Sequence, residues 1–100
     1  MSISSSSAQQ ALVTLGARLR ELRQDAGLTG RELARLAGWH SSKVSKIEHG
    51  RQTPMVNDIM TWSAHCKADH QTAELIAAVR AVEGMYVEWR RINHSGLLHT

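Results

Sequence analysis

The sequence predicts an all-α fold, and three observations carry this prediction. Apolar residues recur at spacings of three and four along most of the 100-residue chain, which is the period of an amphipathic helix. Alternating runs of β-branched residues, which are typical of strands, are scarce, and the chain has one Pro and no Phe. Glycines and a Thr-Pro pair divide the apolar periods, so we expect a five-helix domain with an extended C-terminal helix.

Length and composition favour one domain with a modest core. No apolar run approaches the about 18 residues that a membrane helix needs. The first ten residues, MSISSSSAQQ, lack the basic and apolar regions of a signal peptide. A single cysteine cannot form an internal disulfide, which is typical of a reducing compartment. We therefore expect a cytoplasmic protein that does not bind membranes.

The first helix is expected to follow a serine-rich, flexible tail at residues 1–7. Ser7 and Gln10 fit a capping box, which would start this helix near Ala8. Gly27 ends it. Its apolar residues recur at three and four and comprise Leu12, Leu15, Leu19, Leu22 and Ala26.

Residues 28–53, LTGRELARLAGWHSSKVSKIEHGRQT, predict two short helices joined by a tight turn. Thr29 and Glu32 fit a capping box at the start of the first of these helices. Gly38 ends it, because glycine adopts the left-handed conformation at little cost. Its apolar face comprises Leu33, Ala34, Leu36 and Ala37.

The second short helix begins near His40 or Ser41 and ends at Gly50. It buries Val44 and Ile47, which are three residues apart. Its outward positions carry only hydroxyls and cations, namely Ser41, Ser42, Lys43, Ser45 and Lys46. A helix with one apolar stripe and an outer face of hydrogen-bond donors suits the major groove of DNA.

This stretch resembles the helix-turn-helix of the phage-repressor family (Cro/C1, XRE-type). In that family a hydrophobic residue and Thr or Ser precede x-x-Glu-Leu-Ala, a glycine turn follows, and a short helix ends in Ile-Glu-x-Gly-(Arg/Lys). The sequence supplies Leu28-Thr29-x-x-Glu32-Leu33-Ala34, then Gly38, then Ile47-Glu48-x-Gly50-Arg51. Through Gly38-Trp39 and the following SKVSKIE it is also similar to actinobacterial (Streptomyces-type) regulators, in which a larger C-terminal domain usually follows.

The resemblance implies a helix-turn-helix DNA-binding domain at residues 8–67. In the family, the start and the outer face of the second helix meet base edges, which implies base contacts by His40, Ser41, Ser42 and Lys46. Phosphate contacts are implied for Lys43, which could also reach bases, and for Arg51, Thr53, Arg31 and Arg35. His40, Ser41 and Gly30 depart from the residues common in the family, so the base sequence read by relatives cannot be carried over.

The resemblance also implies a structural ion pair between Arg23 and Glu48, which would tie the first helix to the recognition helix. We expect neither residue to contact DNA. Trp39, in the turn, has two interpretations: it packs over the two helices, or its indole N–H contacts a phosphate. The large apolar area of a Trp side chain favours packing.

The net charge of +3 is unevenly distributed. Residues 18–51 contain eight cations and four anions, whereas residues 52–100 contain four cations and five anions. The positive excess therefore falls on the half of the chain that carries the motif, as expected for a nucleic-acid-binding surface. A solvated basic face would be the alternative if the charge pattern stood alone.

Thr53 and Pro54 predict the start of a fourth helix, because they supply a hydroxyl cap and a proline at the first helical position. Its apolar residues are Met55, Val56, Ile59 and Trp62. Four residues near its end invite a metal interpretation: His65, Cys66, Asp69 and His70. They lie on different faces and complete no four-ligand set, so we expect no metal, no cofactor and a small buried cysteine.

Residues 68–93 predict a C-terminal helix with a heptad-like seam. The seam residues follow spacings of four, three, four and three: Leu75, Val79, Val82, Tyr86 and Trp89. The seam is either a dimerisation surface or the face of a helix packed on its own domain. Aromatic residues near the far end favour the dimer, because a five-helix core should not need them. Residues 94–100 are expected to be a tail or the boundary to a longer chain.

Together these features favour a bacterial transcription regulator that binds double-stranded DNA specifically, as a homodimer on an inverted repeat. The second hypothesis is a protein-interaction module, antitoxin-like or partner-docking, that retains the fold. No nucleophile–base pair, paired carboxylates or phosphate-binding glycine loop is evident, so an enzyme is not expected. The resemblance leaves room for a partner protein or a missing C-terminal effector domain.

Overall fold

The computed structural model describes residues 5–98, with side chains described for residues 6–93. Five α-helices make up most of this part of the chain: α1 (Ser5–Asp25), α2 (Gly30–Ala37), α3 (Ser41–Glu48), α4 (Val56–His65) and α5 (Thr72–Leu98). One turn of 3-10 helix, η1 (Asp69–Gln71), precedes α5. The predicted all-α, five-helix fold with an extended C-terminal helix is confirmed.

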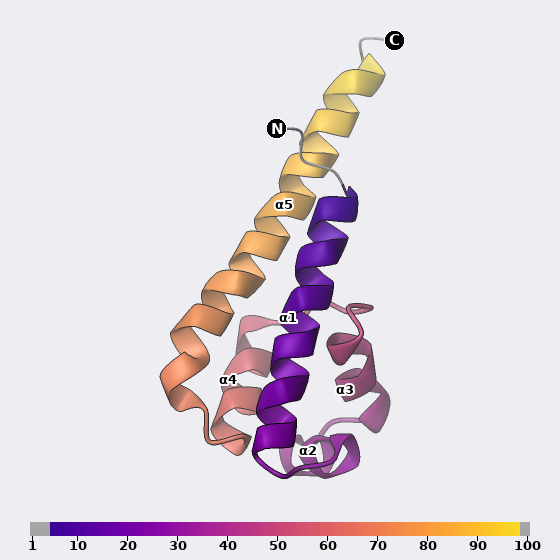
Figure 1. The fold of residues 1–100 in the computed structure, drawn as a ribbon. Helices are drawn as coiled ribbons and strands as arrows, with labels where there is room; N and C mark the ends of the chain where they lie inside the picture. The colour runs from indigo at the N-terminus through magenta and orange to yellow at the C-terminus, as the bar shows by residue number, and fades with distance from the viewer. Residues whose placement is uncertain (1–4, 99–100) are drawn as a thin grey trace.

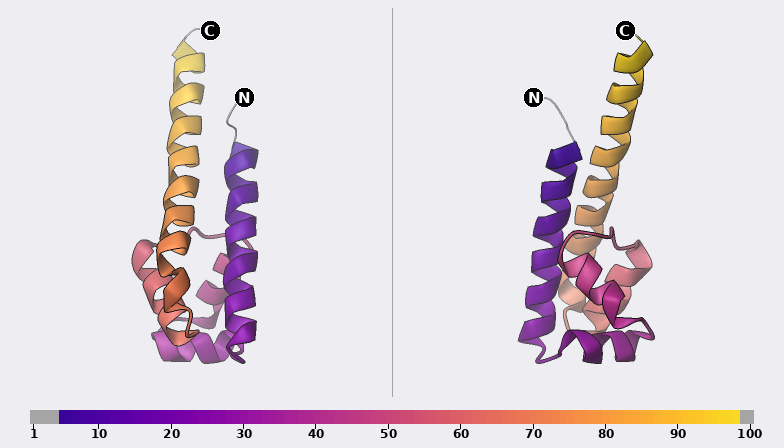
Figure 2. Two further views of the ribbon diagram at one scale, coloured as in Figure 1. Left: turned by 60° about the vertical axis from the view of Figure 1, so that its left-hand side comes forward. Right: turned by 90° about the vertical axis from the view of Figure 1, so that its right-hand side faces the viewer.

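The long helices α1 and α5 run antiparallel, side by side, and α2, α3 and α4 pack against one half of this pair (Figure 1 and Figure 2). The core forms where all five helices meet. Its most buried side chains are each at most 1% exposed: Leu19, Leu33, Val44, Ile47, Ile59, Trp62, Leu75 and Val79. Trp62 is anchored at its polar end, because its indole Nε1–H donates to the Leu19 carbonyl over 3.0 Å.

The start of α1 corrects the sequence prediction. The helix begins at Ser5 rather than near Ala8, so Ser7 lies inside it and is not its N-cap. Ala8 is fully buried, and this tertiary contact stabilises a first turn that serine-rich sequence alone would not favour. The rest of the expected tail, residues 1–4, lies outside the described residues.

The start of α4 also differs from the prediction. The helix begins at Val56 with Met55 as its N-cap, so Thr53 is not the cap and the buried Pro54 precedes the helix. Asp58 Oδ2 accepts from the Met55 N–H over 2.9 Å and thereby satisfies an amide that the helix leaves free. Met55 is 68% exposed and is not a core residue, contrary to expectation.

Three residues of the predicted dimer seam are core residues of the single chain. Leu75 and Val79 are 0% exposed and Val82 is 2% exposed, because α1 covers this face of α5. They therefore cannot form a dimer seam in this fold, and the interpretation of a helix packed on its own domain holds for them. Tyr86 and Trp89, further along α5, remain partly exposed.

Beyond Asn93 the helix continues to Leu98, where a tail was expected from residue 94. The sequence there has no proline, and each further helical residue adds one backbone hydrogen bond. Residues 99–100 lie outside the described residues.

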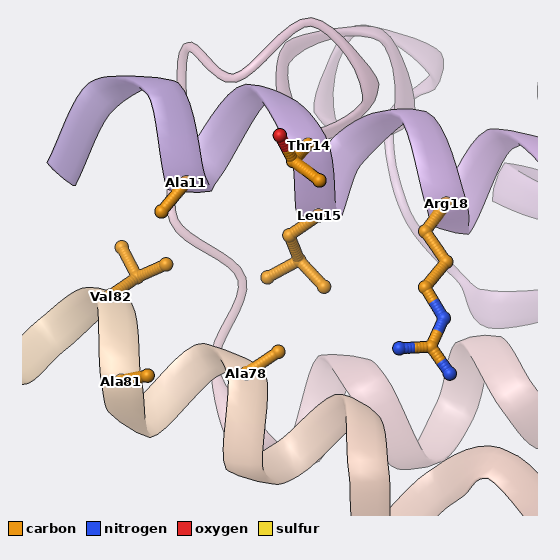
Figure 3. Close-up of a pocket in the computed structure, with 7 residues that line it drawn as sticks. All are labelled: Ala11, Thr14, Leu15, Arg18, Ala78, Ala81 and Val82. Carbon is orange, nitrogen blue, oxygen red and sulfur yellow. The ribbon is translucent and has the colours of Figure 1, made fainter. Parts of the chain in front are cut away.

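A groove of about 270 Å³ separates α1 from α5 on one flank of the pair, where Ala11, Ala78 and Ala81 are too short to fill the space (Figure 3). Arg18 borders it and binds across to α5, with Nη2 placed 2.8 Å from Glu74 Oε2. Val13 and Gly16, on the opposite flank of α1, face the end of α3 and the loop after it. The groove therefore lies on the side of α1 away from α3.

Candidate nucleic-acid interface

Helix α3 presents a polar outer face. Val44 and Ile47 are buried beneath it, at 1% and 0% exposure. The exposed positions are His40, Ser41, Ser42, Ser45, Lys46 and His49. The four residues predicted to contact bases are thus all exposed, at the start and along the outside of this helix.

His40 forms the N-cap of α3. Its Nδ1 accepts the Ser42 N–H over 3.2 Å and lies 2.9 Å from Ser42 Oγ. An accepting Nδ1 carries no proton, so the neutral ring has its hydrogen on Nε2. His40 therefore caps the helix with one nitrogen and has the other as a donor.

Lys43, predicted to contact phosphate, is bonded to other residues of the chain. Its Nζ lies 2.8 Å from Asp58 Oδ1 and 4.5 Å from the centre of the Trp39 ring. Trp39 in turn packs against Trp62, with ring centroids 6.0 Å apart, as the packing interpretation predicts. An ion pair and a cation–π contact together hold the Lys43 charge against α4, away from the outer face of α3.

The loop after α3 places Arg51 at the surface. Gly50 has φ = 70°, the Gly50 N–H donates to the Ile47 carbonyl, and the Arg51 N–H donates to the Lys46 carbonyl over 2.8 Å. This is the Schellman arrangement, which needs a left-handed residue at Gly50. Arg51 is exposed and Thr53 is half-buried.

Helix α2 carries the remaining predicted phosphate contacts, Arg31 and Arg35, both exposed. The predicted capping box is present at its start: Glu32 N donates to Thr29 Oγ1 over 3.1 Å, and Thr29 N donates to Glu32 Oε1 over 3.0 Å. The hydrogen bonds from Thr29 to this carboxylate lower the pKa of Glu32. The Glu32 carboxylate therefore stays ionised, and its negative charge stabilises the N-terminus of α2.

The ion pair predicted between Arg23 and Glu48 is present. Arg23 Nε and Nη2 lie 2.6 and 3.0 Å from the two Glu48 oxygens, and Arg23 Nη1 donates to the Leu28 carbonyl over 2.9 Å. The side chains are only 12% and 5% exposed. The hydrogen bond to Glu48 raises the pKa of Arg23, so the guanidinium stays charged. It joins α1 to the end of α3, and both residues are turned inward.

The charges of this surface are asymmetric. Three anions near it are bonded within the chain: Glu32 accepts from the Thr29 N–H, Glu48 pairs with Arg23, and Asp58 pairs with Lys43. Among the described side chains, four cations in this region have no ion-pair partner, namely Arg31, Arg35, Lys46 and Arg51. The surface around α3 therefore attracts polyanions.

His49 also lies on this surface, although no predicted contact included it. This exposed residue is the C-cap of α3, and its Nδ1 donates to the Ser45 carbonyl over 2.8 Å. In the neutral ring this leaves Nε2 as an acceptor. The sequence could have predicted this position, because His49 precedes Gly50, and the residue before a helix-ending glycine lies at the helix terminus.

The described part of the chain contains no group of three or more His, Cys, Asp or Glu residues placed to hold a metal ion. Within the same residues, no helix combines the length and the apolar character that crossing a membrane requires. Cys66 is buried, as predicted, and this burial raises its pKa to about 11.

Residues 14–76 match the family model described as "Helix-turn-helix domain", which is more than half of the chain. The chain belongs to the helix-turn-helix domain family. In this helix-turn-helix domain, α2 and α3 form the motif, with the turn at Gly38-Trp39. Members of the family are typically non-catalytic. Comparison with curated proteins and with solved structures finds no match.

Proposed function

We propose that the protein is a transcription regulator that binds double-stranded DNA sequence-specifically and inserts α3 into the major groove. One observation carries the proposal: the outer face of a helix-turn-helix second helix combines hydroxyls with the unpaired Lys46, and unpaired arginines flank it on α2 and in the following loop, while Glu48 and Asp58 are paired within the chain. In this motif the second helix enters the groove while the first crosses the backbone.

The accessible residues divide into two roles. His40, Ser41, Ser42 and Lys46 are proposed to meet base edges, and Lys46 is the one suited to guanine, which lysine recognises through O6 and N7. Arg31, Arg35, Arg51 and Thr53 are proposed to bind phosphates, which sets affinity and register rather than sequence. Lys43 is left out of both sets because its charge is held by Asp58 and Trp39.

A homodimer on an inverted repeat remains part of the proposal. Two copies of α3 would then lie about 34 Å apart, one turn of DNA. Because Leu75, Val79 and Val82 are core residues, the dimer contact needs other residues. Tyr86 and Trp89, further along α5, are partly exposed and are proposed to form that contact. A DNA partner would place the protein at the bacterial nucleoid in the cytoplasm.

A protein-interaction module is the second candidate, favoured by apolar surface outside the helix-turn-helix motif. Val87 and Ile92 on α5 are each 47% exposed, and the alanine-lined groove lies on the flank of α1 away from α3. A partner bound there would leave α3 free. A protein partner on this surface is therefore compatible with DNA binding by α3, and the surface does not identify that partner.

Selection from a pool of random double-stranded DNA at about 0.1–0.15 M salt distinguishes the two candidates. We expect enrichment of an inverted repeat, whose spacing gives the separation of the two α3 helices. Enrichment of a single half-site would support DNA reading and contradict the dimer. Binding that is weak, salt-sensitive and without enrichment would contradict the proposed regulator. A Lys46→Ala variant serves as the control, because its enriched sequence should lose preference at one base pair.

A further inference from the structure

One side chain of α1 connects α5 to the loop after α3. Gln9 Nε2 donates to the Gly50 carbonyl over 2.9 Å, and Gln9 Oε1 accepts from the Tyr86 hydroxyl over 3.2 Å. Both ends of the Gln9 amide are therefore used, one by each neighbour. Gln9 and Tyr86 both lie outside residues 14–76, the part of the chain that matches the family.

The Gly50 carbonyl belongs to the same peptide unit as the Arg51 N–H. The carbonyl is held by Gln9, and the N–H is held by the Lys46 carbonyl at 2.8 Å. A planar peptide whose two polar groups are both bonded has a fixed orientation. The backbone position from which the Arg51 side chain starts is therefore set jointly by α3 and α1.

Contact between Gly50 and α1 restricts the loop further. A Cβ placed on Gly50 would lie 2.7 Å from Val13 Cγ2 and 3.0 Å from Val13 Cα, so the loop backbone packs directly on α1. The first turns of α1 thus support the loop through both packing and a hydrogen bond. The Tyr86 hydroxyl, in turn, orients the Gln9 amide from α5.

We propose that Gln9 and Tyr86 are positioning residues for DNA binding, which keep the Gly50–Arg51 peptide in the orientation that Arg51 uses to bind a phosphate. The inference rests on the proposed function. A loop ordered before binding loses less conformational entropy when the phosphate contact forms. The far half of α5 then influences DNA affinity through Gln9, without touching DNA.

The test compares Gln9→Ala with Gln10→Ala, a matched control because Gln10 is the neighbouring glutamine of the same helix and is also exposed. The probe is a mixed-sequence duplex of about 30 base pairs, since a phosphate contact needs no operator. Gln9→Ala removes the hydrogen bond to the Gly50 carbonyl together with the one from the Tyr86 hydroxyl, and it should weaken binding about two- to tenfold. Gln10→Ala should bind like the wild type.

Two further variants test whether Gln9 acts through Arg51. In an Arg51→Ala background, adding Gln9→Ala should cause no further loss of affinity, because the positioned side chain is already gone. Losses that multiply in the double variant would overturn the proposal. Tyr86→Phe removes one hydroxyl without altering the packed ring, and it should weaken binding in the same direction and by less than Gln9→Ala. If Tyr86→Phe bound DNA with wild-type affinity, the proposed positioning role of Tyr86 would be overturned.

Backbone order parameters of the free protein provide a readout that does not depend on DNA. The order parameter of the Arg51 amide should fall in Gln9→Ala and stay unchanged in Gln10→Ala. Unchanged order in both variants would overturn the positioning role. If the wild type failed to bind the duplex, the proposed function would fail, while this measurement would still decide whether Gln9 orders the loop.

Discussion

Gly16 of α1 lies directly beneath the carbonyl of Glu48 at the end of α3: a Cβ on Gly16 would be 2.6 Å from that oxygen. No side chain fits at that distance, and the atom in the way is backbone. The two helices therefore approach each other as closely as they do because residue 16 is glycine. The same crossing lies beside the Arg23–Glu48 pair, so α1 determines where the end of the recognition helix sits.

Replacing Gly16 with Ala should lower the free energy of unfolding by about 1–3 kcal/mol, because α3 must move to admit the methyl group. The matched control is Gly84→Ala in α5, where a Cβ would meet nothing within 4 Å. There the gain in helix propensity should stabilise the protein by about 0.5–1 kcal/mol. Urea denaturation of both variants gives the comparison, and equal stabilisation by both would show that the crossing is looser than the structure indicates.

Two lysines of α3 should respond differently to replacement. Lys46→Ala should weaken specific DNA binding by about 1–3 kcal/mol and relax one base position, because this side chain is free to reach a base. Lys43→Ala should instead cost about 1 kcal/mol of stability, since it removes an ion pair and a cation–π contact. DNA titrations at matched folded fraction measure the affinity of each variant, and urea denaturation measures its stability. An affinity loss in Lys43→Ala as large as that in Lys46→Ala would mean that Lys43 leaves Asp58 to bind DNA.

Arg23→Ala should destabilise the fold by about 3–5 kcal/mol, because it leaves Glu48 buried and without its partner. Arg20→Ala, at an exposed position of the same helix, is the control and should change stability by less than about 0.5 kcal/mol. The double variant Arg23→Met, Glu48→Leu should recover most of the loss, because no buried charge remains. A double variant as unstable as Arg23→Ala would indicate that the hydrogen bond to the Leu28 carbonyl matters more than the ion pair.

The Cys66 thiol should react slowly with a disulfide reagent in the native state. Burial raises its pKa from 9.0 to about 11, so near pH 8 the reactive thiolate is about 100-fold scarcer than in an ordinary thiol. The rate of modification, followed by absorbance with and without urea, checks this expectation. Equal rates in both conditions would show that the helix end around Cys66 opens readily.

Local sequence signals were sufficient to predict the two short helices of the motif, α2 and α3. The Thr29–Glu32 capping box, the turn glycines and the spacing of Val44 and Ile47 are all encoded within a few residues, and the structure has them as predicted. The start of α4 was misplaced because Thr53 and Pro54 are a typical helix start, whereas the Asp58 carboxylate accepts from the Met55 N–H and makes Met55 the N-cap. The Arg23–Glu48 ion pair was predicted from the family resemblance and not from local sequence signals.

Long-range packing explains the remaining differences. The period of Leu75, Val79 and Val82 was read correctly as an apolar face, but a period does not say which helix covers it. The partner is α1, more than fifty residues earlier in the sequence. In the same way, Lys43 was assigned to the outer face from its place in the helix, whereas Trp39 and Asp58 draw its flexible chain aside.

The burial of Cys66 has a practical consequence for studying the protein in solution. Because the sequence has one cysteine and that cysteine is buried, a cysteine introduced at an exposed position outside the proposed DNA contacts, such as Gln24 on α1, would be the one readily labelled by a spin or fluorescent probe. No native residue has to be removed first. Two labelled copies on one DNA would then report the separation of their α1 helices, and with it the geometry of any assembly.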